Sequence, residues 1–131
     1  MKLAPERLQG QLKADLAAIY LISGEEPLQR EEAADAVRAA ARGQGYTERE
    51  VFEVERGFDW NLLRNASANL SLFASRRVLD VRLGNAKPAD GGAEALIAYA
   101  ASPAPDTVLL VTCGKLERGG GAWASALEQA G

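Results

Sequence analysis

The residues best placed for phosphate or metal chemistry follow the first predicted strand, in the segment Ser23-Gly24-Glu25-Glu26-Pro27. In a parallel α/β sheet, ligands bind beyond the carboxyl ends of the strands, so a phosphate-binding loop would lie at this turn. A Walker A loop needs two glycines that flank four residues, followed by Lys and Ser or Thr. This turn has one Gly, no Lys, a Pro without an N–H group, and adjacent carboxylates that would repel a phosphate. The sequence therefore predicts no ordinary nucleotide binding here.

The carboxylate pair Glu25 and Glu26 has two interpretations. The two side chains could hold a metal ion, or they could interact favourably with the dipole of the helix that follows them. Acidic residues are common at helix N-termini, so the second interpretation is favoured. We therefore predict no metal ligand and no cofactor at this turn.

Nucleophilic or hydrolytic chemistry finds little support elsewhere in the chain. There is no histidine, which removes Ser–His and Cys–His pairs and His-ligated metals. Asp80 lies inside a predicted strand, not at its end where a Walker B carboxylate would stand. We expect it to face outward with Arg82, on a solvated or interface surface. A nucleophile built from Cys113 and Lys115 would lack a base and an orienting group, so Cys113 is predicted to be a core residue and no catalytic residue is predicted.

Protein binding is the chemistry suggested by the segment Asn69-Leu70-Ser71-Leu72-Phe73. It joins a predicted helix to a predicted strand, so Leu72 and Phe73 fall on a short connection. Connections lie on the surface and often carry function, and an exposed apolar pair can anchor in a partner's pocket. Spacing alone does not separate this from the alternative that the pair closes the core. Arg76 and Arg77 follow, either as a solvated pair or as a charged rim that steers docking to an acidic partner.

The elements that would position these residues alternate between helices and strands. Helices are predicted over residues 5–18, 27–42, 58–68, 91–101 and 122–130, and strands over residues 18–23, 50–55, 78–83 and 107–113. Short apolar strands that alternate with helices indicate a parallel sheet. The predicted fold class is therefore a three-layer α/β domain, with a parallel sheet flanked by helices.

Composition limits the classes of function. The chain has 131 residues, of which 47% are hydrophobic, enough for one folded domain. The net charge of −3 gives no basic field for nucleic acid or an anionic membrane, so any contact with DNA would have to be local or supplied by partner chains. A single cysteine allows no internal disulfide, and no apolar run approaches the roughly 18 residues of a membrane span, so we expect a cytoplasmic location. The chain stops at a predicted helix, and we expect it to be a fragment of a longer protein.

Several segments, taken in order, resemble the N-terminal domain of the bacterial DNA polymerase III delta-subunit family, the clamp-opening subunits of clamp loaders. Together these segments extend over nearly the whole chain. They are Tyr20-Leu21-Ile22-Ser23-Gly24-Glu25-Glu26-Pro27-Leu28, Asp35-Ala36-Val37-Arg38, Asp59-Trp60-Asn61, Ser71-Leu72-Phe73-Ala74-Ser75-Arg76-Arg77, Leu109-Leu110-Val111, Gly114-Lys115-Leu116 and Ala122-Trp123. The ordered set is specific, although no single segment is decisive.

The resemblance implies one AAA+-like, P-loop-like domain over residues 1–131 with a degenerate nucleotide site, the lid and collar domains being absent from this chain. It implies that residues 69–73 bind the sliding clamp (beta subunit), with Leu72 and Phe73 in a hydrophobic pocket. The wider clamp-binding pattern is Gln-Leu-Ser/Asp-Leu-Phe, and Asn69 stands here in place of Gln.

The same resemblance implies a role in DNA replication within the DNA polymerase III holoenzyme. The chain would help to open the clamp without hydrolysing ATP, and the DNA-directed DNA polymerase (nucleotidyltransferase) activity would belong to the complex. Other clamp-loader subunits would bind through the missing domains, and DNA would be met only by the assembled complex, without a membrane.

Two other classes of function are weighed against this interpretation. One is a small α/β hydrolase or nucleotide-dependent enzyme, which the lack of histidine and of a phosphate loop argues against. The other is an α/β interaction module without a clamp role. An ATP titration would reveal the first class, and clamp binding that survives the loss of Leu72 and Phe73 would favour the second.

Overall fold

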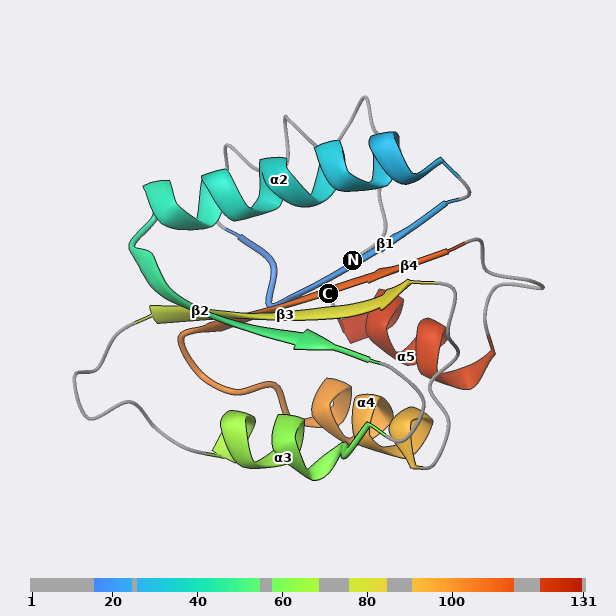
Figure 1. The fold of residues 1–131 in the computed structure, drawn as a ribbon. Helices are drawn as coiled ribbons and strands as arrows, with labels where there is room; N and C mark the ends of the chain where they lie inside the picture. The colour runs from blue at the N-terminus through green and yellow to red at the C-terminus, as the bar shows by residue number, and fades with distance from the viewer. Residues whose placement is uncertain are drawn as a thin grey trace.

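The computed structural model describes residues 16–24, 26–54, 58–68, 76–84, 91–114 and 121–130. In these residues four strands form one sheet in the order β1-β4-β3-β2, and every neighbouring pair is parallel. The strands are β1 (Ile19–Ser23), β2 (Tyr46–Glu53), β3 (Arg76–Gly84) and β4 (Thr107–Cys113). The helices are α2 (Pro27–Gly43), α3 (Asn61–Ala68), α4 (Gly92–Ala101) and α5 (Ala122–Ala130). Figure 1 shows α2 on one face of the sheet and the other three helices on the opposite face, which confirms the predicted layers.

The predicted boundaries agree best where the apolar pattern is strongest. β4 and α5 have the predicted ranges, and α2 and α4 each differ by one residue at one end. α3 begins later than predicted, at Asn61, because the Asp59 carboxylate accepts a hydrogen bond from the Asn61 amide at 2.9 Å and so caps the helix there. Residues 16–18 are not helical, so the first predicted helix does not reach Ala18; its residues 5–15 lie outside the described residues.

One core lies between the sheet and α2. Along α2 the buried residues Ala34, Val37 and Ala41 recur at helical spacing, and the two alanines let the helix backbone approach the strands closely. These residues pack on the side chains that the strands present to this face, which are Tyr20, Val78, Val108 and Leu110.

The larger core lies on the opposite face, under α3, α4 and α5. β4 runs through the middle of the sheet and is buried at all seven positions, so it contributes to both cores. Trp60, just before α3, packs against the start of α4. A Cβ atom at Gly92 would lie 2.4 Å from Trp60 Cε2, so this close approach requires glycine. Phe58 meets Trp60 edge to face at 5.1 Å between ring centroids, which closes the core at this end.

One carboxylate interrupts the core beneath α2. The prediction that Asp80 faces outward is wrong, because its side chain is fully buried. Residues alternate along a strand, so Asp80 shares a face with Val78, and α2 covers that face. There the Arg38 Nε donates to the Asp80 Oδ2 at 2.9 Å. Arg82 lies on the same face of β3 and is one-third exposed, with 33% of its side chain accessible.

Candidate functional site

The turn after β1 is bridged by an arginine of α2. The Arg30 Nη1 donates to the carbonyl oxygen of Gly24 at 2.9 Å and to that of Cys113 at 3.4 Å. These carbonyls belong to the carboxyl ends of β1 and β4, where a parallel α/β sheet would bind a ligand. The guanidinium is therefore directed at main-chain acceptors of its own chain. Among the described residues, which leave out Glu25, no group of three His, Cys, Asp or Glu side chains could hold a metal ion.

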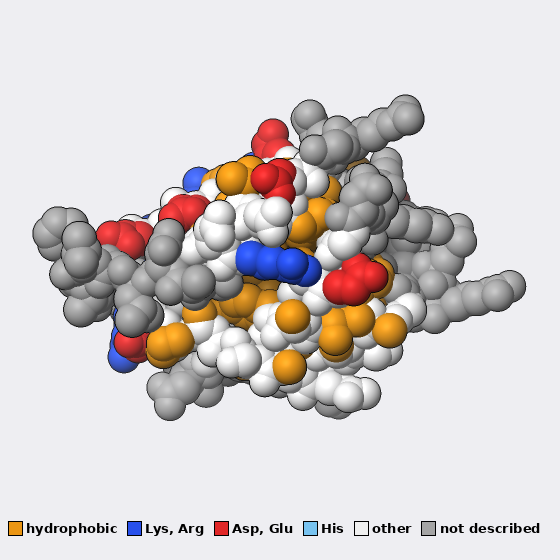
Figure 2. All heavy atoms as spheres, turned by 90° about the horizontal axis from the view of Figure 1, so that it is seen from below, with side chains coloured by type: hydrophobic (Ala, Val, Ile, Leu, Met, Phe, Trp, Pro, Cys, Tyr) orange, Lys and Arg blue, Asp and Glu red, His pale blue; other side chains and the backbone are white. Residues whose placement is uncertain are grey.

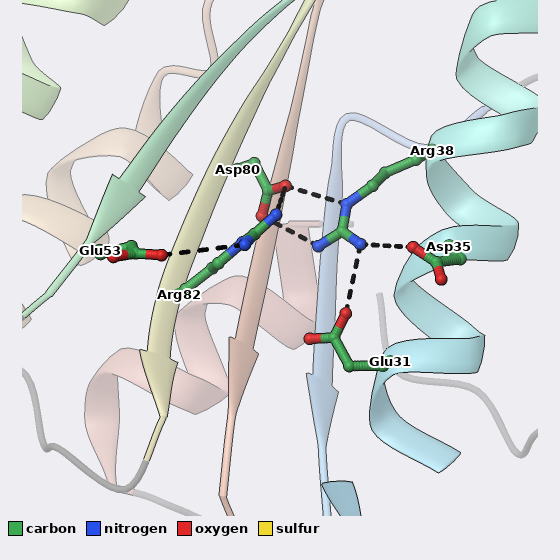
Figure 3. Close-up of polar contacts among 6 residues, drawn as sticks. All are labelled: Glu31, Asp35, Arg38, Glu53, Asp80 and Arg82. Carbon is green, nitrogen blue, oxygen red and sulfur yellow. Dashed lines mark hydrogen bonds and ion pairs between the residues drawn. The ribbon is translucent and has the colours of Figure 1, made fainter. Parts of the chain in front are cut away.

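Figure 3 shows the ion cluster that Asp80 shares with α2 and β2. The Arg38 Nη1 donates to the Asp35 Oδ1 at 2.7 Å, in addition to the bond from Nε to Asp80. Arg82 lies 3.3 Å from Asp80 and 3.9 Å from Glu53. Burial lowers the pKa of Arg38, but the hydrogen bonds and negative charges of its carboxylate partners outweigh burial and raise this pKa above its ordinary value. The cluster joins α2 to β3 and β2, although the buried Nε of Arg82 has no hydrogen-bond partner among the described residues.

The predicted protein-binding segment, Asn69 to Phe73, lies outside the described residues. The structure does place the elements on either side of it. α3 ends at Ala68 and β3 begins at Arg76, so the segment connects a helix to a strand as predicted. Figure 1 shows that α3 lies on one face of the sheet, whereas β3 is a strand of the sheet itself.

Arg76 and Arg77 follow this segment, and their side chains point to opposite faces of β3. Arg76 is about half exposed, at 51% of its side chain. Its Nη1 donates to the Gln44 carbonyl oxygen at 3.0 Å. Arg77 is buried, at 8% exposure, and its Nε donates to the Thr107 Oγ1 at 3.3 Å. The structure therefore does not bring the two guanidinium groups together on one surface.

The face formed by α3 and α4 carries exposed apolar side chains. Leu62 of α3 is 52% exposed and Ile97 of α4 is 38% exposed. Figure 2 views the molecule from this side and shows hydrophobic side chains gathered on it. A shallow groove of about 170 Å³ lies between the two helices, lined by Leu63, Arg64, Ala95, Ala98, Tyr99 and Ser102. This volume is below the roughly 300–1,000 Å³ of small-molecule sites, so the groove is small for such a ligand.

Burial also affects the tyrosine in this groove. It raises the pKa of Tyr99 above the ordinary value of a phenol, while the backbone of Ala104 and the charge of Arg77 act in the opposite direction. Tyr99 therefore stays neutral at physiological pH.

Comparison with known proteins decides the family. The model of the family described as "DNA polymerase III, delta subunit" matches residues 20–131. The chain belongs to this family. Among its delta-subunit relatives, the DNA polymerase III subunit delta of Escherichia coli (strain K12) is 36% identical over 129 residues, which are 97% of this chain and 38% of that protein. The subunit of Haemophilus influenzae is 32% identical over 82 residues, 63% of this chain and 24% of that protein.

A solved structure shares the fold of this delta-family chain. The DNA clamp loader delta protein of Bacillus subtilis superposes with a TM-score of 0.72 at 20% identity, over 97% of this chain and 40% of that one. At this identity the likeness shows the fold alone. The delta-family chain thus spans about two-fifths or less of each of these relatives. None of its helices in the described ranges is long and apolar enough to cross a membrane.

Sequence reasoning missed the contacts of three residues, Arg30, Arg38 and Asp80. A signal existed for Arg38, because it follows Val37 on the buried stripe of α2 and needs a carboxylate partner there. An aspartate in an apolar strand provides that partner. The contact of Arg30 with Cys113 joins residues far apart in the sequence, and no local pattern predicts it.

Proposed function

We propose that this chain is the clamp-binding domain of a DNA polymerase III delta subunit and acts in DNA replication. It binds the sliding clamp (beta subunit) through residues 69–73 and helps to open the ring for loading onto DNA. The observation that carries the proposal is membership of the delta-subunit family together with Leu70-Ser71-Leu72-Phe73 at the connection from α3 to β3. The clamp-binding surface is proposed to comprise Asn69 to Phe73, with Arg76 and Arg77 beside them.

The apolar pair supplies the affinity in this proposal. Burying Leu72 and Phe73 in a pocket of the clamp contributes about 1.5–3 kcal/mol for each side chain in transfer terms. Lost translational and rotational freedom and the ordering of side chains offset much of this gain. We therefore expect a dissociation constant in the micromolar range from this anchor.

Ring opening requires more than an anchor. The domain must bind the open or distorted clamp more tightly than the closed clamp, since a ligand with equal affinity for both states shifts nothing. The helix that precedes the anchor in the sequence, α3, is a candidate for this second contact, because Leu62 is exposed on it. Arg76 and Arg77 are the other candidates, either by touching the clamp or by positioning the segment that does. If replacing both arginines with alanine left clamp opening unchanged, their part in the second contact would be ruled out.

The remaining features of the proposal follow from the family. Residues 1–131 would form a single AAA+-like domain with a degenerate nucleotide site and no ATP hydrolysis of their own. The sequence of the turn after β1 and the contacts of Arg30 support this. Contacts with other clamp-loader subunits would use regions that the longer relatives possess beyond this match. DNA would be contacted only in the assembled, cytoplasmic complex, which carries the polymerase activity.

A calorimetric titration of a bacterial sliding clamp tests the proposal. The unmodified chain is compared with a variant that combines Leu72→Ala and Phe73→Ala. Leu28→Ala is the matched control, since Leu28 is 70% exposed on α2, on the other side of the sheet. We expect binding by the unmodified chain and the control, and none by the double variant. Equal behaviour of the double variant and the unmodified chain would exclude this pair as the anchor.

A further inference from the structure

The first residue of β3 is held by three groups from two other parts of the chain. The Arg76 Nη1 donates to the Gln44 carbonyl oxygen at 3.0 Å. Its guanidinium carbon lies 5.5 Å from the centroid of the Tyr46 ring, and its Nε lies 3.8 Å from the Asp106 Oδ1. Gln44 and Tyr46 precede and begin β2, whereas Asp106 precedes β4. Arg76 thus connects the start of β3 to the starts of both neighbouring strands.

The backbone around Tyr46 has two irregular features next to its contact with Arg76. Gln44 is the C-cap of α2, and Gly45 has a φ of 92°, a left-handed conformation that favours glycine. Tyr46 pairs in register with Arg76, and the register of β2 then shifts between Tyr46 and Glu48. Such irregularities re-aim side chains at the end of a strand. Here the side chains of Tyr46 and Arg76 end in cation–π contact.

Arg77 fixes the other side of the same strand. Its backbone N–H donates to the Asp106 carbonyl oxygen at 3.0 Å, and its Nε donates to the Thr107 Oγ1 at 3.3 Å. The Thr107 hydroxyl donates in turn to the Pro105 carbonyl oxygen at 2.9 Å. Asp106 has a φ of 52°, so the loop before β4 holds a left-handed conformation next to these bonds. The start of β3 is therefore tied on both sides.

We propose that Arg76 and Arg77 are positioning residues, which fix the point where the chain enters the sheet after the clamp-binding segment. Arg76 acts on clamp affinity through Tyr46 and Gln44, not by touching the clamp. This inference rests on the proposed function and assigns a mechanism to the two arginines within it. The burial of Arg77 and the three contacts of Arg76 carry it.

Anchoring one end of a binding segment affects affinity for a general reason. A segment loses conformational freedom when it binds, and this loss opposes association. An end that is already fixed at Arg76 has less freedom to lose. A charge that touches the partner acts differently, because it steers the encounter and makes the association rate sensitive to salt. The two roles therefore predict different kinetics.

The test measures binding kinetics on an immobilised sliding clamp for Arg76→Ala, Tyr46→Leu and the double variant, at two salt concentrations. Loss of an exposed cation–π contact is expected to raise the Kd about two- to fivefold in each single variant. The Kd of the double variant should not exceed the higher of the two single-variant values, because both changes remove the same contact. The rise in Kd should come from faster dissociation. The association rate and its dependence on salt should stay unchanged.

Two controls separate this role from loss of fold or charge. Tyr46→Phe keeps the ring and should bind like the unmodified chain. Arg49→Ala removes an exposed arginine of the same β2 strand and should also leave binding unchanged. Thermal melts of all variants identify any that have lost the fold. Wild-type affinity in a folded Tyr46→Leu variant, or an association rate that loses its salt dependence in Arg76→Ala, would overturn the inference.

Failure of the inference differs from failure of the proposed function. If the unmodified chain does not bind the clamp, or binds equally without Leu72 and Phe73, the assignment of residues 69–73 as the clamp-binding segment is wrong. The positioning role of the two arginines is then overturned as well. If the anchor variant loses binding but Tyr46→Leu does not, only the positioning role is overturned.

Discussion

At the scale of single residues, the buried pair of Arg38 and Asp80 is the strongest electrostatic feature in the described part of the chain. Asp80 is fully buried and Arg38 is 5% exposed, and the two are joined by a 2.9 Å hydrogen bond. Burying such a pair brings little net stability, because desolvation offsets the attraction. The pair joins Arg38 of α2 to Asp80 of β3.

Replacing one partner of this pair should be costly. Asp80→Ala leaves the Arg38 guanidinium buried without its main acceptor, so we expect a loss of about 3–5 kcal/mol in the free energy of unfolding. Combining Arg38→Met with Asp80→Leu should recover much of this loss, since the buried Arg38 charge is then removed together with its partner. Urea denaturation measures both values. A loss below about 1 kcal/mol for the single variant would show that water reaches the site.

Residue identity alone could predict some of the site and not the rest. The apolar pair Leu72 and Phe73 stands out because its neighbours in sequence signal a helix end and a strand start. The partner of Arg76 is Tyr46, on the preceding strand of the sequence, and their contact depends on the parallel pairing of β2 with β3. Such a partner becomes visible only when the strand order is known.

At the scale of elements, the apolar pattern of the sequence predicts the ranges of the buried strands better than that of the exposed edge strand. β4 was predicted at its full extent because every residue from Thr107 to Cys113 suits a buried strand. β2 begins earlier than predicted because it is an edge strand, where residues 47–51 are exposed and show no apolar alternation. The outward placement of Asp80 was wrong for a related reason: the pattern of a strand does not reveal which helix covers which face.

The contact between Trp60 and α4 offers a test at this scale. Gly92→Ala would place a methyl group 2.4 Å from the indole ring, so the ring or the helix must shift. We expect a loss of about 1–3 kcal/mol, typical of overpacking in a core. Gly43→Ala, in the last turn of α2 with no atom within 4 Å of the added Cβ, is the matched control and should not destabilise. Thermal melts compare the two, and equal melting temperatures would contradict a rigid contact between Trp60 and α4.

At the scale of the whole molecule, the domain has a fold that commonly binds ligands at the carboxyl edge of its parallel sheet. In this chain, Arg30 bridges two strand ends at that edge. One guanidinium joins the ends of β1 and β4 by bonds of 2.9 and 3.4 Å. The proposed binding segment connects α3 to Arg76, the first residue of β3, and the amino end of β3 lies opposite to that carboxyl edge.

The sequence of the turn after β1 and the contacts of Arg30 predict that ATP does not stabilise the chain. A nucleotide present at a hundred times its Kd would stabilise the folded state by about 2.7 kcal/mol, which a melting curve detects readily. We expect no shift in melting temperature with millimolar ATP and Mg²⁺, for the unmodified chain and for Arg30→Ala alike. A higher melting temperature of the unmodified chain in the presence of ATP would contradict the proposal of a degenerate site. It would favour the alternative of a nucleotide-dependent enzyme.

The central claim is that residues 69–73 themselves occupy the clamp. The most direct measurement is a competition in which a free peptide spanning residues 66–76 is added to the complex of this chain with a sliding clamp. At concentrations that saturate the peptide's own binding, we predict that it displaces the chain completely. The same peptide with alanine in place of Leu72 and Phe73 should displace none. A chain that stays bound to a clamp saturated with peptide would contradict the account, because its contact would then lie elsewhere.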